Sequence, residues 1–260
     1  MNQMISRISI YKLLAILPIT AFRKINLLLP RQAYGAELSV AELFLQNVFS
    51  GSPSRTHANI VIVMFGLFEV VIFNILFGSL FYRDFFDNSI YIFVRQKSRL
   101  RWYINRLWQL TLFSMIYNTI FIGITFVLSA RYSKFGIDKE ALYMFLLAFV
   151  MVFLFSLWTT ILINLISIKT GSVLSFITNY IALTVCSFLA IFHEKVPIVR
   201  NIPILLALNP VANVTINWGD GIGKGLLPSV YFIIIILITT ILGYMVISRT
   251  DISLENKENS

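Results

Sequence analysis

The residues that could do chemistry in this sequence are few and scattered. It contains two histidines, His57 and His193, and one cysteine, Cys186. Glu194 follows His193, but no second histidine completes the H-E-x-x-H pattern of a zinc hydrolase. A single cysteine builds neither a disulfide framework nor a cysteine-based metal site. No serine in an apolar stretch has an evident base beside it, so we expect no catalytic residue, no metal site and no cofactor.

The densest charge lies in the segment VRQKSRLRWYINR, from Val94 to Arg106, where five cations flank Trp102 and Tyr103. In a soluble protein this composition is typical of a nucleic-acid surface, with cations for phosphates and rings for stacking. Here the run is short and apolar stretches adjoin it on both sides, so we expect no nucleic acid as a partner. The simplest interpretation is that the cations keep the segment cytoplasmic and contact anionic lipid head groups.

The composition indicates a membrane protein. Hydrophobic residues make up 58% of the chain and charged residues 13%, against about 25% charged in soluble domains. A spanning helix needs about 20 mostly apolar residues. Five stretches meet this criterion: 60–81, 107–128, 141–165, 173–192 and 229–247. A sixth, 8–22, is shorter and contains Lys12 and Pro18, so it either crosses or lies in the interface.

We therefore expect one all-α transmembrane domain with six spans, or five if 8–22 is interfacial. The loop 83–106 is the richest in cations, which places it in the cytoplasm. Alternation of the spans then puts the segments 30–58 and 193–228 outside, and the tail 249–260 inside. With both termini cytoplasmic, 8–22 has to cross. The expected location is the cell membrane.

Both external segments contain signals for short helices. Ser39 and Glu42 have the spacing of a capping box and open an apolar helix that lies on the membrane or on the protein. In 193–228, four prolines divide two apolar pieces that are too short to span. Such pieces are typical of re-entrant or interfacial helices.

A further helix is expected in the cytoplasmic loop. In FFDNSIYIFVRQKSRLRW the apolar residues Phe86, Ile90, Phe93, Val94 and Leu100 have nearly helical spacing. This spacing predicts that the segment 86–101 forms an amphipathic helix along the inner surface of the membrane. A rigid helix between two spans is a natural place for a partner protein to push.

From residue 60 onward the chain resembles the permease subunit of an ABC exporter of the ABC-2 type. The matching features are Asp87 after the second span, then Ser89, the apolar turn 90–94, Ser98-Arg99, and the aromatic and basic residues 102–106. The broken segment around LNPVANV before the last span also matches. Within the family the chain is most similar to small permeases of peptide antibiotic export or self-protection.

The resemblance implies a division of labour between subunits. Such a permease forms a homodimer or pairs with a similar permease, and a separate ATPase docks on its coupling helix. That role falls here on Asp87, Ile90, Phe93, Arg95 and Arg99. The sequence has no G-x-x-x-x-G-K-[ST] phosphate loop, which agrees with ATP hydrolysis on another chain. The implied substrate is a hydrophobic or amphipathic peptide.

Polar residues inside the spans are the remaining candidates. Glu69 lies mid-span, where a charged carboxylate facing lipid costs about 2.5 kcal/mol or more. Asn74, Asn118 and Asn164 lie in the same and neighbouring spans. One interpretation is interhelical hydrogen bonding. The other is that these four residues line the translocation path or contact a partner subunit.

Two other functions stay open for the chain. A secondary transporter is often built from internal repeats, and no repeat is visible here. A non-transporting immunity or assembly subunit needs the same spans and a docking loop, so the sequence does not separate it from a permease.

Overall fold

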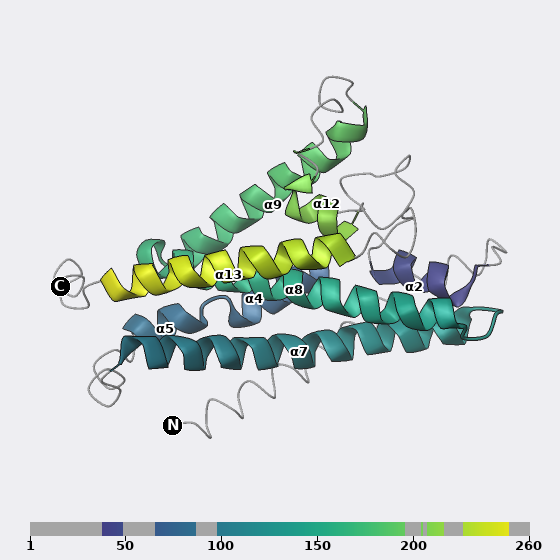
Figure 1. The fold of residues 1–260 in the computed structure, drawn as a ribbon, viewed down its shortest axis with the longest axis horizontal. Helices are drawn as coiled ribbons and strands as arrows, with labels where there is room; N and C mark the ends of the chain where they lie inside the picture. The colour runs from purple at the N-terminus through teal and green to yellow at the C-terminus, as the bar shows by residue number, and fades with distance from the viewer. Residues whose placement is uncertain are drawn as a thin grey trace.

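The computed structural model describes residues 38–48, 66–86, 98–195, 204, 207–215 and 226–249. Within these ranges the fold is helical and contains no strand, which confirms the all-α prediction (Figure 1). The helices are α2 (Val40–Val48), α4 (Phe68–Phe77), α5 (Leu80–Phe86), α7 (Arg99–Tyr132), α8 (Lys139–Thr170), α9 (Ser172–Lys195), α12 (Pro210–Thr215) and α13 (Leu226–Arg249).

Four of these helices are long and apolar enough to cross a membrane: α7, α8, α9 and α13. They correspond to the predicted spans 107–128, 141–165, 173–192 and 229–247. The predicted span 60–81 is described from residue 66 onward, as α4 and the start of α5. The predicted span 8–22 lies outside the described residues. The protein is thus a membrane protein with at least four candidate spans.

The helices α7 and α8 are longer than a bilayer requires. They contain 34 and 32 residues, which at about 1.5 Å per residue gives roughly 50 Å. The hydrocarbon core is about 30 Å thick. Ser98 caps the start of α7 through a hydrogen bond from the amide of Arg101 (3.4 Å), so the helix begins at Arg99 and includes part of the predicted cytoplasmic loop.

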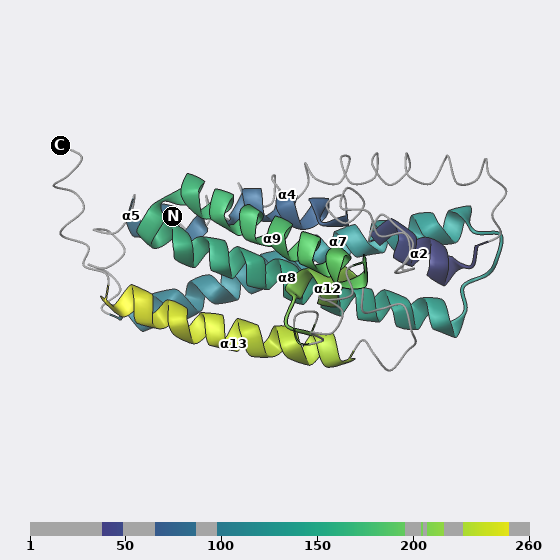
Figure 2. The same cartoon turned by 90° about the horizontal axis from the view of Figure 1, so that it is seen from above.

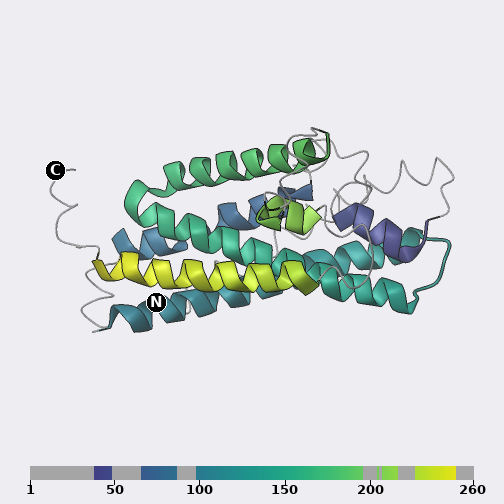
Figure 3. The ribbon, with the colours of Figure 1, turned by 45° about the horizontal axis from the view of Figure 1, so that its top comes forward.

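The central element of the bundle is α8, which packs against all seven other described helices (Figure 2). A helix that is apolar on every side is stable only when it is surrounded. At its end Gly171 has a φ of 82°, a left-handed conformation that suits glycine, and the chain reverses directly into α9 (Figure 3). This turn lies between the predicted spans 141–165 and 173–192.

Charge is distributed unequally between the two ends of the bundle. One end is formed by α5, the starts of α7 and α9, and the ends of α8 and α13 (Figure 1, left). We call it the basic end, because its described residues include one carboxylate, Asp84, and six cations: Arg83, Arg99, Arg101, Arg106, Lys169 and Arg249. At the opposite, far end, α2, the end of α7, the start of α8 and the connection between them have three cations, Arg131, Lys134 and Lys139, and three carboxylates, Glu42, Asp138 and Glu140.

At the far end α2 is formed by the predicted capping box. The amide of Glu42 donates to Oγ of Ser39 (3.2 Å), and the amide of Ser39 donates to Oε2 of Glu42 (3.0 Å). The apolar residues Leu43 and Val48 are buried against α7 and α8. Of the two predicted locations, α2 therefore lies on the protein.

The short helix α12 is also packed on the bundle, against α9, α8 and α13. Oδ1 of Asn209 accepts from the amides of Val211 (2.9 Å) and Ala212 (3.1 Å), and its Nδ2 donates to the carbonyl of Cys186 (2.7 Å). Pro210 occupies the first turn, where a missing N–H costs no hydrogen bond. One asparagine thus caps α12 and attaches it to α9.

Candidate functional site

The span that contains Glu69 is interrupted at Gly78–Ser79, where α4 ends and α5 begins (Figure 1). The side chain of Asn164, from α8, occupies this break. Its Nδ2 donates to the carbonyl of Phe77 (2.9 Å), and its Oδ1 accepts from the amide of Phe81 (2.7 Å). In a continuous helix these two backbone groups would bond each other. The carboxamide is therefore inserted into the helical hydrogen-bond ladder, a known cause of kinks.

The break lies in a tightly packed part of the protein. A Cβ on Gly78 would come within 2.8 Å of the Phe176 ring of α9 and 3.0 Å of Ile163 of α8. Phe77 and Phe81 are almost wholly buried on either side. Irregular backbone at membrane depth is tolerated where protein shields it and its polar groups are bonded, and both conditions are met here.

Asn164 belongs to a polar seam that joins α4, α7 and α8. Its seven members are fully buried: Asn74, Ser114, Asn118, Ser156, Thr159, Thr160 and Asn164. Four come from α8, where the spacing of three and four residues puts them on one face. On α7, Ser114 and Asn118 are likewise one turn apart.

Short hydrogen bonds connect the seam across helices. Nδ2 of Asn118 donates to Oγ of Ser156 (2.8 Å), and the hydroxyls of Ser114 and Ser156 lie 3.0 Å apart, which ties α7 to α8. Oγ1 of Thr160 lies 2.6 Å from Oδ1 of Asn74, which ties α8 to α4. The seam thus fixes the register of three helices at membrane depth.

Three of the four predicted path residues, Asn74, Asn118 and Asn164, meet in this seam. Glu69 lies on α4 and is 1% exposed; its backbone carbonyl accepts from the hydroxyl of Tyr117 (2.8 Å). All four residues are buried in this conformation. Asn74, Asn118 and Asn164 hydrogen-bond to neighbouring helices, as the interhelical interpretation expects.

At the basic end, α5 and α7 are tied by an ion pair. Oδ2 of Asp84 contacts Nε of Arg106, with side chains only 11% and 12% exposed. Arg106 also donates from Nη1 to Oε1 of Gln109 (2.5 Å). The ring of Phe85 lies 5.9 Å from that of Trp102. The two helix ends that flank residues 87–97 are thereby held together.

Arg99 ties α7 to α13. Its Nη1 donates to the carbonyls of Ser248 (3.2 Å) and Ile247 (3.3 Å), at the end of α13. A cation at this position bonds the last carbonyls and complements the negative end of the helix dipole. One turn further, the hydroxyl of Tyr103 donates to the carbonyl of Thr240 (3.0 Å).

Arg99 was predicted to belong to the coupling helix, and the structure places it in the first turn of α7. The other predicted coupling residues, Asp87, Ile90, Phe93 and Arg95, lie outside the described residues. The sequence did not single out Asp84, Tyr103, Ser114, Ser156 or Thr160 as site residues. For the seam residues of α8 a signal was present, since small polar residues recur at helical spacing in SLWTTILIN.

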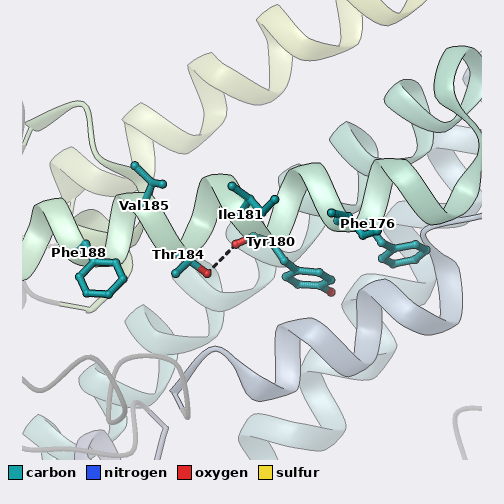
Figure 4. A pocket seen from close by; sticks show the side chains of 7 residues that line it. Phe176, Tyr180, Ile181, Thr184, Val185 and Phe188 are labelled. Atoms are coloured by element: carbon teal, nitrogen blue, oxygen red, sulfur yellow. Dashed lines mark hydrogen bonds between the residues drawn. The ribbon is translucent and has the colours of Figure 1, made fainter.

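A shallow apolar groove runs along α9 from Phe176 to Phe188, with a volume of about 500 Å³ (Figure 4). Phe176 and Tyr180 lie at one end, and the hydroxyl of Tyr180 donates to the carbonyl of Val71 of α4 (3.4 Å). Thr184 bonds within its own helix, to the carbonyl of Tyr180 (2.8 Å). The groove therefore presents an apolar surface suited to a lipid environment.

Comparison with models of known families, with curated proteins and with solved structures found no match for this chain. Among the described residues no group of three or more His, Cys, Asp or Glu is placed to hold a metal ion.

Proposed function

We propose that this chain is the membrane-spanning permease subunit of an ABC exporter of the ABC-2 type. It works with a separate ATPase, as a homodimer or paired with a similar permease. It moves a hydrophobic or amphipathic peptide outward through the membrane. The basic end is cytoplasmic, the spans number six with 8–22 and 60–81 crossing, and both termini are inside.

The observation that carries this proposal is the anchoring of the helices on both sides of residues 87–97. The buried Asp84–Arg106 pair joins the end of α5 to the start of α7, and α7 continues without interruption for 34 residues. A protein that binds 87–97 would therefore push on a rigid rod as long as the bundle. This arrangement supports a force-receiving role for the segment.

In this proposal Ile90 and Phe93 fill a groove on the ATPase, while Asp87 and Arg95 set the register at the rim. Apolar anchors usually dominate a docking interface, and rim charges mainly tune rate and orientation. Arg99 acts inside the chain, where it passes displacement of α7 to α13 through the bonds to Ile247 and Ser248.

The substrate proposal rests on the resemblance and on the apolar character of the spans. Glu69, Asn74, Asn118 and Asn164 border the path in a conformation more open than the packed one. A buried carboxylate at Glu69 would favour a cationic peptide. Equal peptide sensitivity of cells with and without the intact protein would contradict this role.

The test is purification of the tagged full chain from its native membrane, followed by assay of ATP hydrolysis. We expect an ATPase to co-purify. Phe93→Ala should weaken its binding by about 2 kcal/mol or more, as for interface hot spots. Lys97→Ala, the matched control, should cost about 0–1 kcal/mol, the range of single ion pairs at an interface rim. Full ATPase recovery with an Ile90→Ala, Phe93→Ala double variant that inserts normally would refute docking at this segment.

A further inference from the structure

The hydrogen bonds across the break between α4 and α5 can be made in two alternative ways, and we call each arrangement a closure. In the observed closure Nδ2 of Asn164 donates to the Phe77 carbonyl, and Oδ1 of Asn164 accepts from the Phe81 amide. If the carboxamide withdraws, the same two backbone groups are partners for each other in a regular helix. Each closure satisfies both groups, and that matters because an unbonded backbone group is strongly unfavourable at membrane depth.

The two sides of the break have different polar anchors. On the α4 side, Asn74 bonds Thr160 of α8, the Val71 carbonyl accepts from Tyr180 of α9, and the Glu69 carbonyl accepts from Tyr117 in the middle of α7. On the α5 side, Asp84 is paired with Arg106, near the start of α7. A displacement of the start of α7 would therefore reach α5 directly and be absorbed between these anchors, at Gly78–Ser79.

Asn164 also has a partner that does not depend on the break. Its Nδ2 lies 2.9 Å from the carbonyl of Thr160, one turn earlier in α8. The carboxamide can therefore leave the break and keep a hydrogen bond within its own helix. Gly78 contributes as well, because glycine is a weak helix former and stabilises neither closure through a side chain.

We infer that Gly78–Ser79 is a two-state joint, in which the Asn164 carboxamide exchanges with the direct hydrogen bond from Phe81 to Phe77. With the carboxamide inserted, α4 and α5 are separate helices. With it withdrawn, residues 68–86 form one helix and α5 changes direction relative to α4. The use of this motion in transport rests on the proposed function, whereas the existence of the joint does not.

The experiment measures the direction of α5 in the full-length chain by pulsed EPR in lipid nanodiscs. Cys186 is the only cysteine, so Cys186→Ala gives a background for paired labels. One pair joins α5 to the far end of α13, through Arg83→Cys and Leu227→Cys. The reference pair joins α4 to the same point, through Ile75→Cys and Leu227→Cys. All three labelled positions are exposed.

We expect Asn164→Leu to move the Arg83–Leu227 distance to a new value and to leave the Ile75–Leu227 distance unchanged. Asn118→Leu is the matched control, since it removes another fully buried carboxamide of the seam away from the break. It should leave both distances as in the unmodified chain. An unchanged Arg83–Leu227 distance in Asn164→Leu, or the same shift in Asn118→Leu, would overturn the joint.

A second variant decides the question if Asn164→Leu fails to insert. In the observed closure a methyl on Gly78 would lie 2.5 Å from the Asn74 carbonyl oxygen, 2.8 Å from the Phe176 ring and 3.0 Å from Ile163. The two side chains can shift, whereas the carbonyl oxygen moves only with the helix, and a regular helix does not impose that backbone contact. Gly78→Ala should therefore favour the continuous helix and give a new Arg83–Leu227 distance with the Ile75–Leu227 distance unchanged. A shift of both distances would mean general loosening of the bundle and would refute the joint.

Discussion

The two ends of the bundle are held together by different kinds of interaction. At the far end α2 is buried by apolar contacts and capped locally by Ser39 with Glu42, and the bond that joins it to α7 links neutral groups, Asn47 with Ser129 (3.2 Å). At the basic end the bonds between helices include charged groups, as in Arg99 with Ser248 and Asp84 with Arg106. Hydrogen bonds that involve a charged group are roughly twice as strong as those between neutral groups. The comparison indicates that the basic end holds its helices in defined relative positions.

The largest expected effect is loss of the basic-end ion pair. Asp84→Ala leaves Arg106 partly buried without its carboxylate, and breaking a buried pair costs about 3–5 kcal/mol. Unfolding in mild detergent, followed by helix content, measures it. The matched control at the far end is Asp138→Ala, which removes the cap on the amide of Ala141 and should cost about 1 kcal/mol. Equal losses in the free energy of unfolding for the two variants would show that the two ends do not differ in the way described.

Packing of α13 gives the next effect. A methyl on Gly243 would collide with the Tyr103 hydroxyl and come within 2.7 Å of Leu165, so Gly243→Ala should destabilise by about 1–3 kcal/mol. Gly123→Ala is the control, because no atom lies within 4 Å of the added methyl. In a helix interior that change should stabilise by about 0.5–1 kcal/mol. Thermal unfolding of the two variants in the same detergent tests the sign of each effect.

Loss of the α7–α13 contact at the basic end should affect transport more than stability. Arg99→Gln removes the charged bonds to Ile247 and Ser248, whereas Arg101→Gln removes a neighbouring exposed cation. We expect Arg99→Gln to retain the ATPase and to lower transport per ATP several-fold. Arg101→Gln should behave as the unmodified chain. ATP hydrolysis and peptide transport measured in the same vesicles give the ratio, and an identical ratio for both variants would remove Arg99 from the mechanism.

The smallest effect is expected in the polar seam. Hydrogen bonds between membrane helices average about 0.6 kcal/mol, so Ser114→Ala should destabilise by less than 1 kcal/mol. Its hydroxyl lies 3.0 Å from that of Ser156, and the neighbouring amide of Asn118 still bonds Ser156. Denaturation in mixed micelles measures this change. A loss of several kcal/mol would mean that the seam, and not the ion pair, dominates stability.

The sequence predicted the features that depend on local composition. Four spans followed from apolar runs of sufficient length, and the first turn of α2 followed from Ser39 and Glu42. The sequence placed the start of the third span at 107 and assigned 86–101 to a separate amphipathic helix. In the structure α7 begins at Arg99 and continues through the span, since Ser98 caps it and a helix can extend beyond the bilayer.

The interruption of the span 60–81 could not be predicted from its own residues. Gly78-Ser79 is tolerated inside many membrane helices, and the break depends on Asn164, which is remote in sequence and reaches it only in the folded bundle. The pairing of Asp84 with Arg106 was hidden for the same reason, because the two residues lie at opposite ends of the expected loop 83–106 and meet only in the folded bundle. Residues that act through distant partners carry little local signal.

Peptide transport in inside-out membrane vesicles that contain the ATPase and this chain tests the proposed export directly. We expect peptide to accumulate inside the vesicles only when ATP, the ATPase and the intact chain are all present. Accumulation should fall at least about tenfold in the Ile90→Ala, Phe93→Ala variant, as expected from losing about 1.4 kcal/mol or more of docking energy at limiting ATPase. Equal accumulation in vesicles that lack this chain would contradict the proposed function.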